Sequence, residues 1–163
     1  MTAGHQPAPP EASPPLPVSM RLQAVAWIDG GARGNPGEAG CGLVVELGDG
    51  TREEHSIYLG HRTNNVAEYA GLLAALTRAR DLGVRDIRVL SDSQLLVQQM
   101  NGSYRVKARH LQPLWLRAQA LARSFRTCRC EHVFREANRE ADALANRAMT
   151  TRRSTLPVPE PLP

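Results

Sequence analysis

The order of hydrophobic patterns constrains the fold of this chain more than any other feature. Three β-type runs come first, at Leu22–Ile28, Cys41–Leu47 and Arg52–Leu59, and Gly48-Asp49-Gly50 marks a hairpin turn between the second and third. Helical and strand patterns then alternate: a helix over Asn64–Leu82, a strand over Ile87–Leu90, helices over Gln94–Met100 and Leu111–Phe125, a strand over Arg129–Phe134 and a helix over Asn138–Met149. An antiparallel start followed by strand–helix crossovers predicts an α/β fold, with a mixed sheet and helices packed on it.

The prolines divide the chain into a folded part and two tails. The 163 residues suit one compact domain, and prolines concentrate at both ends, where apolar residues are few. We predict a disordered tail over residues 1–19, a folded domain over residues 20–149 and a second disordered tail over residues 150–163. Within the folded part, Ser93 and Asn138 are the expected N-caps of the helices that follow them.

Charge and cysteine content narrow the functional classes. The net charge of +4 comes almost entirely from arginine, since Lys107 is the only lysine, and this balance fits a nucleic-acid partner or simply a soluble surface. Cys41, Cys128 and Cys130 have neither a disulfide framework nor a zinc-site spacing. No apolar run is long enough to span a membrane and no secretory signal is visible, so we expect a cytoplasmic protein.

Four acidic residues stand where an isolated charge is unfavourable. Asp29 closes an apolar strand, Asp92 follows another, and Glu68 and Asp142 lie early in helices beside apolar residues. Each alone has an ordinary explanation, as a helix cap or as a charge that complements a helix dipole. As a converging set they would repel one another and lose hydration, so they indicate a cation, and oxygen ligands favour Mg²⁺ or Mn²⁺. Two such ions about 4 Å apart hydrolyse phosphodiesters.

Glycines and amides surround these acids in the sequence. The stretch from Gly30 to Asn35, which includes Gly34, has little side chain, so a nucleic-acid minor groove could lie against it; a tight turn is the alternative. Thr63-Asn64-Asn65 precedes Glu68, and because one Asn suffices for a helix cap, the second amide is free to contact a base edge or a sugar. Gln94, two residues after Asp92, could do the same.

Together the motifs resemble type 1 ribonuclease H, the family that hydrolyses the RNA strand of RNA–DNA hybrids. The matching segments occur in the family's order and span residues 22–149. They are Asp29-Gly30-Gly31-Ala32-Arg33-Gly34-Asn35-Pro36-Gly37, Thr63-Asn64-Asn65-Val66-Ala67-Glu68, Ser91-Asp92-Ser93-Gln94 and Asn138-Arg139-Glu140-Ala141-Asp142-Ala143-Leu144-Ala145.

The resemblance implies a ribonuclease H-like fold: a five-stranded mixed sheet, its first three strands antiparallel, flanked by helices. It implies that two Mg²⁺ ions, with Mn²⁺ as a substitute, are held by four acids, namely Asp29, Glu68, Asp92 and Asp142. Water would attack the phosphorus and leave a 5′-phosphate and a 3′-hydroxyl. Contacts with the hybrid's minor groove are implied for Gly30, Asn35, Asn64, Asn65 and Gln94, and Thr63 would lie at a phosphate pocket for the DNA strand. We expect a monomer.

Three departures from the family pattern place this chain in a short form. The link before the last acid is Arg135-Glu136-Ala137-Asn138, which lacks the catalytic His of many members, and Arg135 would instead assist product or metal release. The inserted basic helix of other members is absent, and Ala108 stands where the phosphate pocket has an Asn. His132 is expected to be an ordinary strand residue. The alternatives are a hybrid-binding module without catalysis and another nuclease of the same fold.

Overall fold

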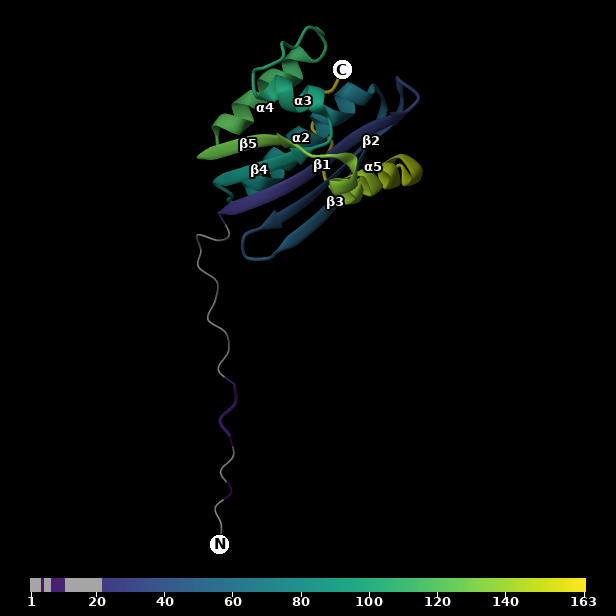
Figure 1. Ribbon diagram of the computed structural model, residues 1–163. Helices are drawn as coiled ribbons and strands as arrows, with labels where there is room; N and C mark the ends of the chain where they lie inside the picture. The colour runs from purple at the N-terminus through teal and green to yellow at the C-terminus, as the bar shows by residue number, and fades with distance from the viewer. Residues whose placement is uncertain (1–3, 5–6, 11–21) are drawn as a thin grey trace.

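A single mixed sheet organises the described part of the chain. The computed structural model describes residues 4, 7–10 and 22–163. Its strands lie in the order β3-β2-β1-β4-β5, with β1 to β3 antiparallel and with β4 parallel to β1 and β5 parallel to β4 (Figure 1). The strands are β1 (Gln23–Arg33), β2 (Gly37–Leu47), β3 (Arg52–Arg62), β4 (Asp86–Ser91) and β5 (Thr127–His132). The predicted α/β fold is confirmed.

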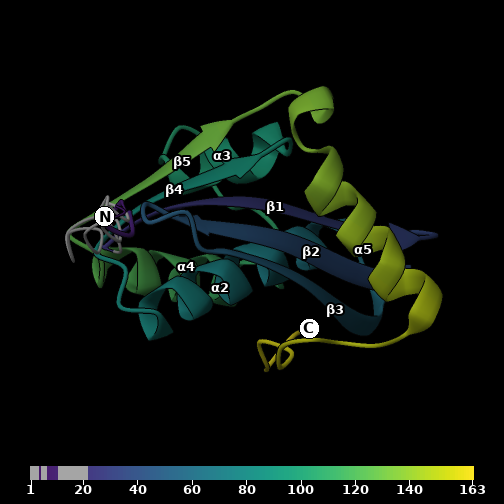
Figure 2. The ribbon, with the colours of Figure 1, turned by 90° about the horizontal axis from the view of Figure 1, so that it is seen from below.

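Helices cover the sheet on both faces. They are α2 (Asn64–Asp81), α3 (Gln94–Met100), α4 (Gln112–Arg123) and α5 (Arg139–Thr151), with a 3₁₀ turn, η1 (Arg135–Ala137), before α5. Figure 2 shows α2 and α4 on one face of the sheet and α5 across the other. Alternate β1 residues, Ala24, Ala26 and Ile28, are buried in the same core as Leu72 and Leu76 of α2. The alternate residues of β1 and the apolar face of α2 therefore form one apolar layer.

The second face depends on a close approach between α5 and β2. A Cβ added at Gly42 would lie 2.3 Å from the carbonyl oxygen of Ala141, closer than any side chain permits. The Ser56 hydroxyl on β3 donates to the Leu144 carbonyl at 2.7 Å, which also fixes the helix against the sheet. The glycine at position 42 thus sets how near the acidic first turn of α5 comes to β1.

The strand that carries Asp29 is longer than the sequence indicates. The sequence predicts its end at Ile28, but β1 continues to Arg33, and β2 begins at Gly37 rather than Cys41. The parallel pairing of β1 with β4 does stop at Ile28, opposite Ser91, whereas the antiparallel pairing with β2 continues to Arg33. Backbone hydrogen bonding to β2 keeps the glycine-rich stretch extended although its composition favours a turn.

The C-terminal segment differs from its predicted disorder. It lies beside β3, the edge strand of the sheet, where the Thr155 amide donates to the Ser56 carbonyl at 2.8 Å and the Tyr58 amide donates to the Ser154 hydroxyl at 2.9 Å. Further on, the Arg117 guanidinium donates to three successive backbone carbonyls, and Leu156, Val158 and Leu162 pack against the core. The prediction of disorder is therefore corrected. Proline-rich composition does not show which residues the segment contacts, and those residues lie on β3, α2 and α4.

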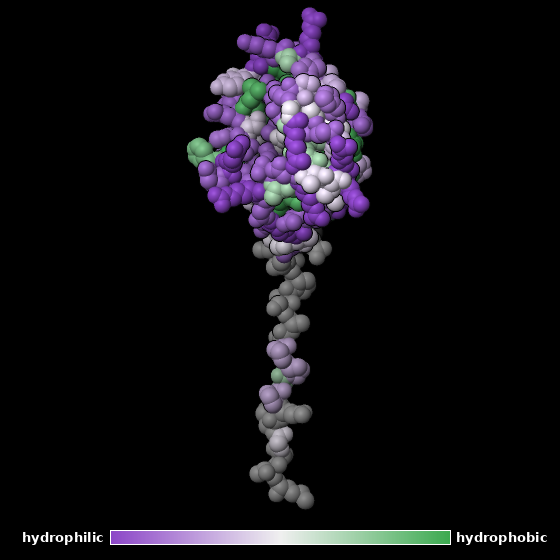
Figure 3. Space-filling model, turned by 90° about the vertical axis from the view of Figure 1, so that its right-hand side faces the viewer, coloured by the Kyte–Doolittle hydropathy of each residue, from purple (hydrophilic) through white to green (hydrophobic). Residues whose placement is uncertain are grey.

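The remaining features concern the surface. Most of the predicted tail over residues 1–19 lies outside the described residues; residues 4 and 7–10 are exposed and have no regular secondary structure. None of the helices within the described ranges combines the length and apolar character needed to cross a membrane. Seen from the right-hand side of Figure 1, hydrophobic residues form small separate patches among hydrophilic ones (Figure 3).

Candidate active site

Asp29 lies where the sheet divides. It is the first β1 residue beyond the parallel pairing with β4, and it pairs on its other side with Gly42 of β2. Asp92 follows β4 directly, at the same edge. Because the carboxyl ends of neighbouring parallel strands lie side by side there, Asp29 and Asp92 approach each other although they are 63 residues apart in the sequence. Asp29 is only 8% exposed, so its carboxylate is largely removed from water.

Glu68 joins them because β1 and α2 touch at a glycine. A Cβ at Gly30 would lie 2.4 Å from the carbonyl carbon and oxygen of Ala67, the residue before Glu68. One carboxylate oxygen each of Asp29, Glu68 and Asp92 can be chosen so that all lie within 4.8 Å of one another. Oxygen Oε2 of Glu68 is buried without a hydrogen-bond partner. A buried carboxylate oxygen without such a partner is suited to coordinate a cation.

Asp142 reaches the cluster from α5 and stands at its rim. Its carboxyl group lies beside that of Asp29 and contributes to the raised pKa of Asp29. The start of α5 is fixed by Asn138, which is 1% exposed and whose side-chain amide donates to the Ile28 carbonyl at 2.8 Å. Asn138 is the N-cap residue of α5, as predicted, but its side chain makes no capping bond because it binds β1 instead. Ser93 does cap α3, with its hydroxyl accepting from Leu96.

The electrostatics of the cluster are those of acids without a counter-charge. Burial raises the pKa of Asp29 from 3.8 to about 8, and the charge of Asp92 and the hydrogen bond with Asp142 act in the same direction. Burial, followed by Asp29 and Asp92, also holds the pKa of Glu68 well above its ordinary value. Among the described residues no ion pair includes any of the four acids. The donor set is entirely carboxylate, which suits a hard divalent cation such as Mg²⁺ or Mn²⁺.

A cleft of about 610 Å³ surrounds the cluster. Eight residues proposed from the sequence line it: Asp29, Gly30, Asn64, Asn65, Glu68, Asp92, Arg135 and Asp142. Nine that were not proposed as site residues also line it: Gly31, Ala32, Arg33, Ser93, His132, Phe134, Ala145, Asn146 and Met149. Arg33 lies within a recognised motif and Asn146 directly follows one, a signal that could have found them, whereas the placement of Phe134 and Met149 follows only from the fold.

Gly34, Asn35, Thr63 and Gln94 do not line this cleft. The side chains of Asn35 and Thr63 make local bonds, because Asn35 Oδ1 accepts from the Asn64 amide at 3.1 Å and the Thr63 hydroxyl accepts from Val66 at 3.2 Å. Thr63, not an asparagine, is thus the cap of α2. The side-chain oxygen Oδ1 of Asn64 accepts from the Ala32 backbone amide at 2.7 Å, which leaves the side-chain NH₂ group for a ligand.

The fold and this site define a ribonuclease H-like domain, as the sequence motifs indicate. The chain belongs to the family described as reverse transcriptase-like, which matches residues 28–148.

Relatives and solved structures agree with that assignment. Ribonuclease HI of Halobacterium salinarum is 42% identical over 125 residues, which is 76% of this chain and 63% of that protein. The bifunctional protein Rv2228c of Mycobacterium tuberculosis is 48% identical over 130 residues, 78% of this chain but 36% of that protein. This chain therefore spans about a third to two thirds of the length of these relatives. The structure of the N-terminal RNase H domain of Rv2228c superimposes with a TM-score of 0.76 at 47% identity, covering 80% of this chain and 95% of that one. The structure of LC11-RNase H1 in complex with an RNA/DNA hybrid superimposes with a TM-score of 0.74 at 36% identity, covering 79% of this chain and 98% of that one.

Proposed function

We propose that this domain cleaves the RNA strand of RNA–DNA hybrids as a metal-dependent endoribonuclease. The observation that carries the proposal is the convergence of the Asp29, Glu68 and Asp92 carboxylates, with Glu68 Oε2 buried and unpartnered. The hybrid bound to the similar LC11-RNase H1 supports the choice of substrate. Because all four acids come from one chain, a monomer would possess a complete site.

The four acids, Asp29, Glu68, Asp92 and Asp142, would hold two divalent cations, Mg²⁺ or its substitute Mn²⁺. Cations bound there would supply a nucleophilic water of lowered pKa and would neutralise charge that develops on the phosphate oxygens. Water adds to phosphorus as the bond to the 3′-oxygen breaks, and the products are a 5′-phosphate and a 3′-hydroxyl. The carboxylates must be ionised to act, so the raised pKa values of Asp29 and Glu68 mean that cations and protons compete for the same oxygens.

The cleft walls would orient the hybrid. Gly30 exposes its backbone because no side chain fits there, and the free Asn64 NH₂ and the exposed Asn65 side chain border the same cleft. Amides of this kind can donate to 2′-hydroxyls and base edges in the wide minor groove, which distinguishes RNA from DNA. Arg135, at the rim, carries a charge suited to releasing a phosphate product. Gly34, Asn35, Thr63 and Gln94, outside the cleft, remain proposed contacts with the flanking duplex.

The test is cleavage of four end-labelled duplexes, namely RNA–DNA, DNA–DNA, RNA–RNA and DNA–RNA with the label exchanged, in Mg²⁺, Mn²⁺ and chelator. The proposal expects divalent-dependent internal cuts in the RNA strand of the hybrid only. Binding of the hybrid without cutting would favour a non-catalytic binding module. Cutting of DNA would favour another nuclease of this fold. Asp92→Asn protein is the matched control for contaminating nuclease.

A further inference from the structure

An exposed aromatic ring stands on the rim of the acidic cleft. Phe134 is 76% exposed, more than any other large hydrophobic side chain in the described ranges, and it lines the cleft together with the four acids. Single exposed hydrophobic residues are common and need no explanation by themselves. This one differs by its position and by the way in which it is held.

A second ring holds Phe134 in one orientation. The rings of His132 and Phe134 meet edge to face, with centroids 5.4 Å apart and planes at 81°. The two residues are separated by one position in an extended segment, so both side chains project from the same face. An edge-to-face contact is the favoured geometry for such rings and restricts rotation of the Phe134 side chain. The pair therefore presents a pre-oriented apolar surface to solvent.

The backbone on both sides of the ring is tied to the elements that carry the acids. The Val133 amide donates to the Ser91 carbonyl at 2.9 Å, and Ser91 precedes Asp92. The Phe134 carbonyl accepts from the Ala137 amide at 2.9 Å, and the next residue, Asn138, is bonded to Ile28 beside Asp29. These bonds fix the distance between the ring and the carboxylates, as expected of a group that contacts the substrate close to the reacting atoms.

The rest of the cleft explains what the ring would touch. Its other walls are acids, amides, arginine and exposed backbone, which suit phosphates, hydroxyls and base edges. A nucleotide also has an apolar surface, the C–H face of its sugar, and an aromatic ring can pack on that face whatever the base is. On the basis of the proposed function, we propose that Phe134, oriented by His132, packs against a sugar of the cleaved strand beside the acid cluster.

The decisive experiment compares Phe134→Ala with Leu116→Ala in steady-state cleavage of a hybrid. Leu116 is 58% exposed on α4, outside the cleft, and is therefore the matched loss of an exposed apolar side chain. Phe134→Ala is expected to raise KM about ten-fold while kcat changes less than about two-fold, because the lost contact is made equally in the ground and transition states. Phe134→Trp should retain a low KM, and Leu116→Ala should change neither constant. His132→Ala should raise KM by less than Phe134→Ala.

Salt dependence separates this contact from an electrostatic one. Phe134→Ala removes no charge, so the slope of log KM against log salt concentration should stay as in the wild type, whereas Arg135→Ala should lower it by about one. Equal KM values for wild type and Phe134→Ala would overturn the inference, as would an equal loss for Leu116→Ala. Because the ring is exposed, melting temperatures should be unchanged, and a drop would assign it a structural role instead. Failure of the wild type to cut any hybrid refutes the proposed function; hybrid binding in Ca²⁺ then tests Phe134 alone.

Discussion

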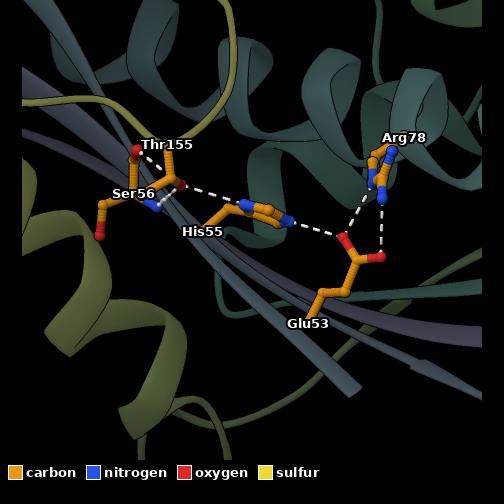
Figure 4. A network of polar contacts seen from close by, with 5 residues as sticks. All are labelled: Glu53, His55, Ser56, Arg78 and Thr155. Carbon is orange, nitrogen blue, oxygen red and sulfur yellow. Dashed lines mark hydrogen bonds and ion pairs between the residues drawn. The ribbon is translucent and has the colours of Figure 1, made fainter. Parts of the chain in front are cut away.

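Two groups of carboxylates in this molecule have opposite surroundings. In the Glu53 network, shown in Figure 4, the Arg78 guanidinium donates to both oxygens of Glu53 at 2.8 Å, and His55 donates to Oε1 at 2.7 Å. The network continues to Thr155, whose hydroxyl lies 3.0 Å from the other His55 nitrogen. In the acid cluster, Asp29 is surrounded by other acids. One group joins β3, α2 and the C-terminal segment, and the other lies in a cleft.

The direction of each pKa shift follows from these neighbours. Hydrogen bonds from Arg78 lower the pKa of Glu53 from 4.5 to about 2, and those from His55 add to the effect. Burial and Asp92 raise the pKa of Asp29 to about 8. A paired carboxylate stabilises the fold in its ionised form, whereas an unpaired buried one stabilises it only when protonated or bound to a cation. The comparison therefore assigns Glu53 to structure and supports the proposed catalytic role of the acid cluster.

The largest contrast is expected in cleavage rate. Asp92→Asn removes the charge of a proposed metal ligand, and we expect kcat to fall at least about a hundred-fold, since a catalytic cation contributes several kcal/mol to the transition state. Glu53→Gln lies outside the cleft and should leave kcat unchanged at a temperature where both variants are folded. Single-turnover cleavage of a labelled hybrid measures both. Near-wild-type Mg²⁺-dependent activity in Asp92→Asn would remove Asp92 from the ligand set.

In stability, the two groups should respond with opposite signs. In chelator at neutral pH, Asp29→Asn relieves repulsion and desolvation and should raise the free energy of unfolding by about 1 kcal/mol or more. Glu53→Gln leaves Arg78 with a weaker partner, and because the Glu53 side chain is 21% exposed, the expected loss is limited to about 1 kcal/mol. Urea unfolding monitored by circular dichroism gives both values. Destabilisation by both substitutions would contradict the distinction between the two groups.

The pH dependence of metal-free stability should have two limbs. Between about pH 4 and pH 8 the folded state holds more protons at Asp29 than the unfolded state, and Glu68, whose pKa is also raised, adds to this difference, so the unfolding free energy falls as pH rises. Between about pH 4.5 and pH 2 the unfolded state holds more protons at Glu53, so stability falls as pH falls. Melting curves in chelator should therefore show a maximum near pH 4 to 5.

Variants and metal assign each limb to its residue. Asp29→Asn should make the decline above pH 5 shallower, leaving the part due to Glu68, and Glu53→Gln should flatten the decline below it. The proposed Mg²⁺ site requires ionised carboxylates, so the stabilising effect of Mg²⁺ should grow with pH and should be smaller in Asp29→Asn. An alkaline limb that neither Asp29→Asn nor Mg²⁺ changes would mean that another group titrates there.

Local sequence patterns revealed the acid cluster but not the Glu53 network. Asp29 and Asp92 end apolar strands, and the order of the elements predicts that those strand ends meet. Nothing near Glu53 in the sequence distinguishes it from other surface acids, because its partner Arg78 lies 25 residues away on another element. The ordered C-terminal segment escaped prediction for the same reason, since its hydrogen bonds join Thr155 to Ser56, 99 residues away.

Backbone pairing limits prediction in the same way. Gly31 and Gly34 have turn-type composition, yet β1 runs through Gly31 to Arg33 because β2 supplies its hydrogen bonds, and only the positive φ of Gly34 marks the actual turn. Asn138 looks like a helix cap in the sequence, but its side chain binds Ile28 across the core. A sequence pattern thus locates residues whose role depends on their own helix or strand. Residues whose role depends on contact with a distant helix or strand can be located only once the fold is known.

The smallest contrast is between two arginines. Arg78 is fully engaged by Glu53, whereas Arg135 lines the cleft and belongs to no ion pair among the described residues. Arg135→Ala should therefore slow multiple-turnover cleavage about three- to five-fold, because one charge-assisted contact to a phosphate is worth about 1 kcal/mol in partly exposed surroundings, and it should leave the melting temperature unchanged. Arg78→Ala should do the reverse, lowering the melting temperature by a few degrees without affecting turnover.

If Arg135→Ala slowed the single-turnover rate as much as multiple turnover, Arg135 would act on the bond-breaking step rather than on product release. Unchanged kinetics would make Arg135 an ordinary surface charge.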